Sequence, residues 1–121
     1  MGSDPIFVLI ALLACVAATL FHHIHNAEFL DQYPNLPGGI SRLGVYLAWL
    51  ATTAIGLIGY WWRRRGLLIA YGCYGLGGLA HYAIAPVSAH TPVMNVSIWL
   101  EAAAGAALLS VVALSSDRRG P

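Results

Sequence analysis

Ionisable side chains set within long apolar runs are the residues of this chain whose types and spacing could do chemistry. Such groups are costly in a membrane and usually face a partner, a cavity or the interior of a helix bundle. His22, His25 and Glu28 recur at intervals of three, which places them on one stripe of a helix. Nitrogen and oxygen ligands of this kind suit zinc or copper(II). The pattern therefore predicts a metal site made by His22, His25, Glu28, His81 and His90.

Glu101 predicts a second kind of chemistry. It lies near the middle of the last apolar run, where its own helix offers it only Ser97 one turn away. An unpaired carboxylate there is too costly, so we expect Glu101 to face the bundle interior, beside a pocket and near polar groups of the first or third run. It could then act as acid and base on a lipid-soluble substrate, or couple proton flow to the transport of a small molecule.

Two more interpretations stay open. Histidines on facing helices could hold one haem b, as in other helix bundles. The chain could also be a structural subunit of a larger membrane complex, or form a homo-oligomer. A pocket in this region is predicted to be lined further by Asn26, Tyr82, Met94, Asn95 and Ser97. His23 is expected to point away from it, because it follows His22 by about 100° around the helix.

Four apolar runs must position these side chains, and they cover about residues 5–30, 41–62, 66–84 and 92–114. Each is long enough to cross a hydrocarbon core of about 30 Å as a helix, the conformation that satisfies the backbone in lipid. Asp4, Ser41 and Thr91 are predicted N-caps. Short connections make consecutive helices antiparallel neighbours. The sequence predicts an all-α fold, a four-helix bundle running up-down-up-down, as one transmembrane domain of residues 1–121 with a polar tail at 115–121.

The composition agrees with a chain embedded in the lipid bilayer. Of its 121 residues, 59% are hydrophobic and 9% are charged, whereas about a quarter of the residues in a soluble domain are charged. So few charges could not cover a surface that faces water. The net charge of +1 offers no basic stripe for nucleic acid. We expect the first run to remain as a helix, since no positive leader precedes it.

Arginine counts predict the orientation. Arg63, Arg64, Arg65, Arg118 and Arg119 fall on the side of the two termini, and Arg42 falls alone on the other. Because cytoplasmic loops are enriched in Lys and Arg, both termini are predicted to be cytoplasmic. The histidine-bearing ends of the helices then face the periplasm. We therefore expect a multi-pass protein of the bacterial inner membrane, with a polar pocket open to the periplasmic side.

Three segments, residues 22–29, 33–37 and 85–95, carry a resemblance to small bacterial four-helix integral membrane proteins. This resemblance covers most of the chain and implies the architecture and the location, but no activity. His25 and Glu28 are also similar to the H-x-x-E-E motif of another group of membrane proteins, although Phe29 replaces the last glutamate. The arrangement resembles, as an architecture alone, the sterol isomerase-like fold, which places acids and histidines in an outer cavity.

Overall fold

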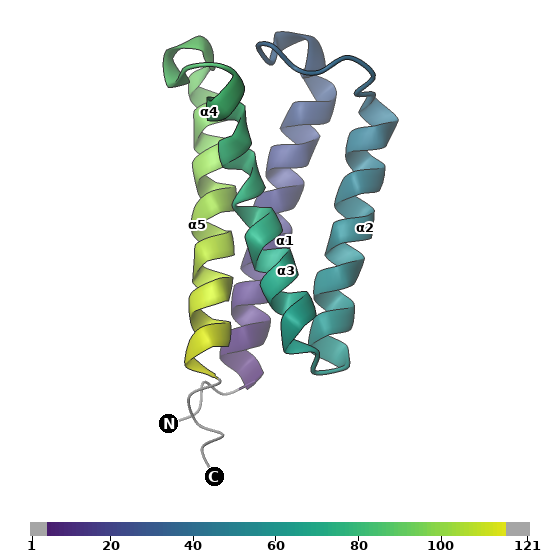
Figure 1. Ribbon diagram of the computed structural model, residues 1–121, viewed down its shortest axis with the longest axis vertical. Helices are drawn as coiled ribbons and strands as arrows, with labels where there is room; N and C mark the ends of the chain where they lie inside the picture. The colour runs from purple at the N-terminus through teal and green to yellow at the C-terminus, as the bar shows by residue number, and fades with distance from the viewer. Residues whose placement is uncertain (1–4, 116–121) are drawn as a thin grey trace.

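A computed structural model describes residues 5–115, and within this range the chain is helical, with no strand (Figure 1). Four segments are long and apolar enough to cross a membrane. The all-α prediction and the four candidate spans are therefore confirmed, whereas Asp4 and the tail from residue 116 lie outside the described residues. The elements in order are α1 (Pro5–Glu28), η1 (Leu30–Gln32), α2 (Arg42–Trp61), α3 (Arg65–Gly75), η2 (Gly77–Ala80), α4 (His81–Ile84), η3 (Val87–Ala89) and α5 (Pro92–Leu114).

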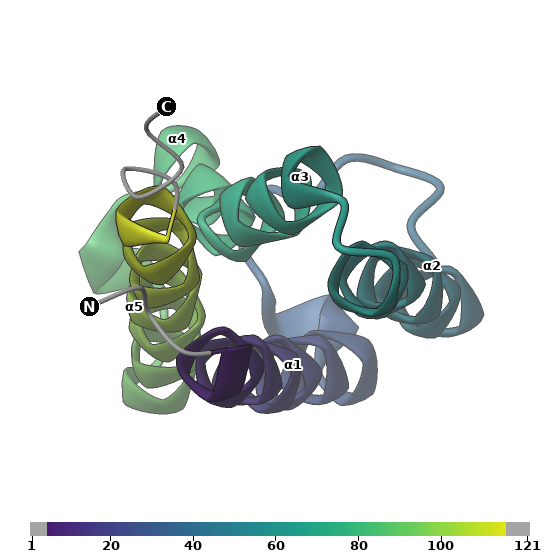
Figure 2. The same ribbon diagram turned by 90° about the horizontal axis from the view of Figure 1, so that it is seen from below.

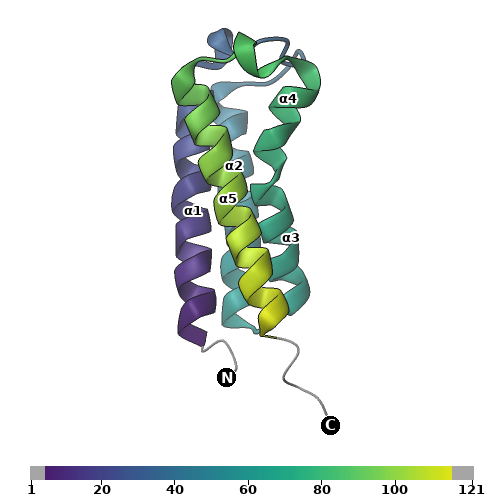
Figure 3. The ribbon, with the colours of Figure 1, turned by 90° about the vertical axis from the view of Figure 1, so that its left-hand side faces the viewer.

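The four spans form a ring in which each helix packs mainly against two others. Seen from below, α1 packs against α2 and α5, and α3 packs against the same two helices (Figure 2). The connections after α1 and α4 lie together at one end of the bundle, here called the loop end (Figure 3). The start of α1 and the end of α5 lie at the opposite end, here called the termini end. The predicted caps of α2 and α5 are present, because Ser41 Oγ accepts from Gly44 N at 3.0 Å and Thr91 Oγ1 from Met94 N at 3.3 Å.

The third span is not the single helix predicted for residues 66–84. The α-helix stops at Gly75, the chain tightens into the 3₁₀ segment η2, and a last helical turn, α4, follows. Glycine is a poor helix former, and Gly75, Gly77 and Gly78 all fall at this change of winding. The tighter turn lies across from Glu101 on α5, so it shapes the region around that side chain.

Glycines also determine how closely α3 approaches α5. A Cβ atom added at Gly105 would lie 2.7 Å from the carbonyl oxygen of Gly72 and 3.0 Å from the Cα atom of Gly75. Small residues permit such contact between helices in lipid, where hydrophobicity provides little drive for association. Gly105 therefore joins the two backbones directly.

Burial divides the bundle into two halves. At the termini end the core is apolar, and its members are Ala11, Leu12, Cys15, Leu68, Tyr71, Leu108 and Val112. Toward the loop end, apolar side chains such as Met94 and Ile98 are buried together with polar ones, and the polar ones are Thr19, His22, His81, His90, Ser97 and Glu101. Large apolar side chains such as Leu13, Leu47 and Trp99 are more than half exposed, as expected for a surface that faces lipid.

A hydrogen-bonded layer separates the two halves. Thr19 Oγ1 lies 3.1 Å from Tyr71 OH and accepts from Trp49 Nε1 at 3.2 Å. Tyr71 OH also lies 3.3 Å from Thr53 Oγ1. Three helices thus satisfy one another's polar groups, and this layer forms a floor beneath the polar half.

Candidate functional site

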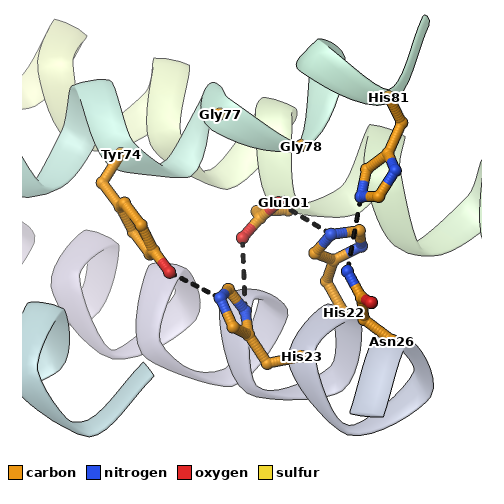
Figure 4. Close-up of a pocket in the computed structure, with 8 residues that line it drawn as sticks. All are labelled: His22, His23, Asn26, Tyr74, Gly77, Gly78, His81 and Glu101. Atoms are coloured by element: carbon orange, nitrogen blue, oxygen red, sulfur yellow. Dashed lines mark hydrogen bonds and ion pairs between the residues drawn. The ribbon is translucent and has the colours of Figure 1, made fainter. Parts of the chain in front are cut away.

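Glu101 is the centre of the buried polar half. Its side chain is 1% exposed, and its two carboxylate oxygens face different histidines of α1 (Figure 4). Oε2 lies 3.7 Å from His22 Nε2, and Oε1 lies 3.7 Å from His23 Nδ1. The prediction that Glu101 faces the bundle interior, near polar groups of the first span, is confirmed.

Hydrogen bonding determines which nitrogen of His22 carries a proton. Ser97 Oγ donates to the carbonyl of Met94 at 2.8 Å, so its only proton is used there. His22 Nδ1, 3.1 Å from Ser97 Oγ, must therefore donate to it. A neutral His22 then presents the bare lone pair of Nε2 to Glu101, which places a proton acceptor opposite a carboxyl group.

His23 belongs to the site, and the expectation that it points away is wrong. Its Nδ1 donates to the carbonyl of Thr19 at 2.7 Å, and its Nε2 accepts from Tyr74 OH at 2.5 Å. The angle of about 100° between successive residues of a helix places His22 and His23 on either side of the carboxylate rather than removing one of them. Tyr74, which was not among the predicted site residues, holds the His23 ring in this position.

A cavity of about 200 Å³ adjoins the carboxylate, and we call it the inner cavity. Its lining residues are His22, His23, Asn26, Tyr74, Gly77, Gly78, His81 and Glu101. Three atoms of this lining are buried without a hydrogen-bond partner, namely Glu101 Oε2, Asn26 Oδ1 and His81 Nδ1. An unsatisfied buried polar atom costs about 1–3 kcal/mol. The inner cavity is therefore built to receive a polar group.

Tyr33, which was also not among the predicted site residues, closes the site from the loop end. The residue is 4% exposed, its ring centroid lies 5.0 Å from that of His81, and its OH lies 2.9 Å from His25 Nδ1. Burial raises the pKa of the Tyr33 phenol to about 12, so the phenol stays protonated in its hydrogen bond with His25. An aromatic residue inside a loop rich in proline and glycine is the signal that could have indicated it.

Three of the five predicted metal ligands, namely His25, Glu28 and His90, are not among the residues that line the inner cavity. His25 stacks on Phe29 with ring centroids 4.7 Å apart. Glu28 accepts from Arg42 Nη2 at 2.7 Å and from Tyr46 OH at 2.6 Å, which ties the end of α1 to the start of α2. Within residues 5–115, no group of three or more His, Cys, Asp or Glu side chains is arranged to hold a metal ion. Metal binding stays a prediction, which elemental analysis of the purified protein tests.

The remaining predicted site residues organise the connection between α4 and α5. Tyr82 OH donates to Asn95 Oδ1 at 2.7 Å, and His90 Nδ1 donates to the carbonyl of Pro86 at 2.9 Å. Met94 is fully buried beside them. His90 still approaches the site, because its ring centroid lies 6.0 Å from that of His81. His90 Nε2 is buried without a hydrogen-bond partner.

Comparison of the chain with protein-family models, with curated proteins and with solved structures finds no match.

Proposed function

We propose that this protein is an intramembrane acid–base catalyst in which Glu101 exchanges a proton with a small polar group bound in the inner cavity. The observation that carries the proposal is the pairing of a fully buried carboxyl group with a bare imidazole nitrogen, Glu101 Oε2 and His22 Nε2, at 3.7 Å. This distance is longer than a hydrogen bond. Catalytic contacts are often loose before substrate binds and tighten around it.

The buried position favours a shared proton. A bare carboxylate in this low-dielectric environment would be costly, whereas a carboxylic acid opposite a neutral imidazole, or a carboxylate opposite an imidazolium, leaves the pair neutral overall. The two forms differ only in the place of one proton. A group that enters between Oε2 and Nε2 can accept a proton from the protonated member of the pair and donate a proton to the other member, as general acid–base catalysis requires.

Three histidines would supply the proton from the loop end. The ring centroid of His22 lies 5.3 Å from that of His81, and His81 lies 6.0 Å from His90, which belongs to the connection after α4. His81 Nδ1 and His90 Nε2 have no partner, so a water molecule between these two rings could bond to both. The line of rings leads from the connecting loops to Glu101.

The other half of the bundle favours catalysis over proton-coupled transport. Beneath Glu101 lies the layer of Thr19, Trp49, Thr53 and Tyr71, in which each polar side chain has a partner. Below this layer the core is closed by apolar side chains that include Leu12 and Leu108, both 0% exposed. A carrier needs access from both sides of the membrane, and these residues leave access from the loop end.

Infrared spectroscopy of the protein in membranes tests the proposal. We expect a carbonyl band of a protonated carboxyl group that Glu101→Gln removes and that Glu28→Gln, a matched change at the exposed glutamate, leaves in place. His22→Asn should shift this band to higher frequency, because the carboxyl group loses the acceptor opposite it, whereas His25→Asn should not. A spectrum in which Glu101→Gln removes no carboxyl band, or in which His22→Asn leaves the band unmoved, would contradict a shared proton.

We also propose that the loop end faces the periplasm of a bacterium and that both termini are cytoplasmic. The support is the arginine distribution, since Arg63, Arg64 and Arg65 join α2 to α3 at the termini end. A reporter fused after Arg119 should be active only as a cytoplasmic marker, and one inserted near Gly38 should be active as a periplasmic marker. The reverse pattern would turn the site toward the cytoplasm.

A further inference from the structure

A second cavity lies beside the first. It measures about 380 Å³, and we call it the outer cavity. Its lining comes from α1, the following loop and the start of α2, and consists of His23, Asn26, Gly39, Ile40, Ser41, Gly44, Val45 and Ala48. His23 and Asn26 line both cavities, so these two side chains lie between them.

We propose that the two cavities together hold one amphiphilic ligand, whose small hydrogen-bond-donating head, an amine or a hydroxyl group, enters the inner cavity while its apolar chain occupies the outer one. This inference rests on the proposed function and names the substrate class of the same site. The inner cavity has a volume of about 200 Å³. Typical ligand sites are larger, with volumes of about 300–1,000 Å³. The inner cavity suits a head group rather than a whole ligand or a macrocycle.

The unpartnered atoms of the inner cavity determine which head groups can bind there. Asn26 Oδ1 presents a lone pair to the inner cavity, and the neutral pair of Glu101 and His22 presents a second one beside its shared proton. His81 Nδ1 presents an N–H, because its Nε2 accepts from Asn26. An amine or a hydroxyl group both donates and accepts, so either head can bond to these atoms. A carboxylate or phosphate head has no donor for Asn26 Oδ1, and neither lysine nor arginine is among the lining residues of either cavity. The site therefore discriminates against anionic heads.

The lining of the outer cavity favours an apolar chain on the ligand. Ile40, Val45 and Ala48 make its walls apolar. The hydroxyl oxygen of Ser41 is already engaged in capping α2, where it accepts from Gly44 N. Leu43 and Leu47, on the same stretch of α2, are 66% and 54% exposed, so the outer cavity lies next to a surface that faces lipid. The apolar chain of a ligand dissolved in the bilayer would enter the outer cavity without crossing water.

Photolabelling of the full chain in lipid bicelles tests this inference. Three probes share a ten-carbon chain with a diazirine at its far end and carry an amine, a hydroxyl or a carboxylate head. We expect the amine and hydroxyl probes to label residues 39–48 at least about tenfold more than the carboxylate probe, which corresponds to the loss of one or two hydrogen bonds. Labelling of Leu50 and Leu57, which face lipid, should be similar for all three and serves as the internal reference.

Two variants test whether the apolar chain of the ligand occupies the outer cavity. Ala48→Phe should fill the cavity and reduce labelling of residues 39–45 to the level of the carboxylate probe. Ala51→Phe, one turn further along α2 and outside the cavity lining, should leave the labelling unchanged. Equal labelling by all heads, or equal loss in both variants, would overturn the inference. Failure of the infrared test together with head-selective labelling would instead remove the acid–base role and leave the amphiphile site standing.

Discussion

Replacement of Gly105 by alanine should destabilise the protein by about 3 kcal/mol, at the upper end of the cost of overpacking a core. The added Cβ would lie 2.7 Å from the backbone oxygen of Gly72 and 2.9 Å from the carbonyl carbon of Gly75. Both obstacles are backbone atoms, which cannot rotate aside as a side chain can. The helices α3 and α5 would have to separate, and the contacts on both sides of the crossing would loosen with them.

Gly66→Ala is the matched control for this prediction. A Cβ at Gly66 meets nothing within 4 Å, so the variant should be as stable as the unmodified chain, or slightly more stable because alanine favours the helix. Reversible unfolding in mixed detergent micelles compares the free energies of unfolding of the two variants. Equal stability would mean that α3 and α5 do not meet through Gly105.

Replacement of Gly78 by alanine should disable the site while the bundle stays folded. A Cβ at this position would overlap the Oε2 atom of Glu101, the end of a flexible side chain that can move. The carboxyl group would be displaced from its place opposite His22, and a bound head group would lose its hydrogen bond to Oε2, worth about 1.5–3 kcal/mol. We expect labelling by the amine probe to fall about ten- to hundredfold and the Glu101 carboxyl band to shift.

Gly77→Ala provides a control one residue away in the same 3₁₀ segment. Nothing lies within 4 Å of a Cβ at Gly77, and neither glycine has a positive φ, so alanine strains neither backbone. Both substitutions restrict the unfolded chain equally, and any difference between them reports the overlap with Glu101. Variants that behave alike in labelling and in the carboxyl band would show that Gly78 does not position the carboxylate.

Two features of this protein could be predicted from the hydropathy of the chain and from the free-energy cost of burying a charge. The four spans follow from the length of the apolar runs, and they begin and end within a few residues of the predicted bounds. The interior position of Glu101 follows from the cost of a carboxylate in lipid. Neither inference needs to know which helix lies beside which, so both could be made from the sequence.

The composition of the site depended on contacts that a sequence pattern does not contain. His23 was excluded on the assumption that one narrow stripe of α1 faces the interior, whereas the site receives side chains from a wider face. Glu28 was included because it shares a stripe with His22, but it pairs with Arg42 of the next helix. Tyr33 reaches the histidines only because its loop folds back over them, and the tightening at Gly77–Ala80 depends on packing against α5.

The direct contact between α3 and α5 also determines where the bundle can open. Gly105 joins the two helices backbone to backbone, and the apolar core closes the termini end beyond it. Above this contact, the third span continues as a 3₁₀ turn, a geometry that often marks a hinge. Because η2 itself packs against α5, an opening at the loop end would involve α4 and the connection after it, while the contact at Gly105 holds α3 against α5.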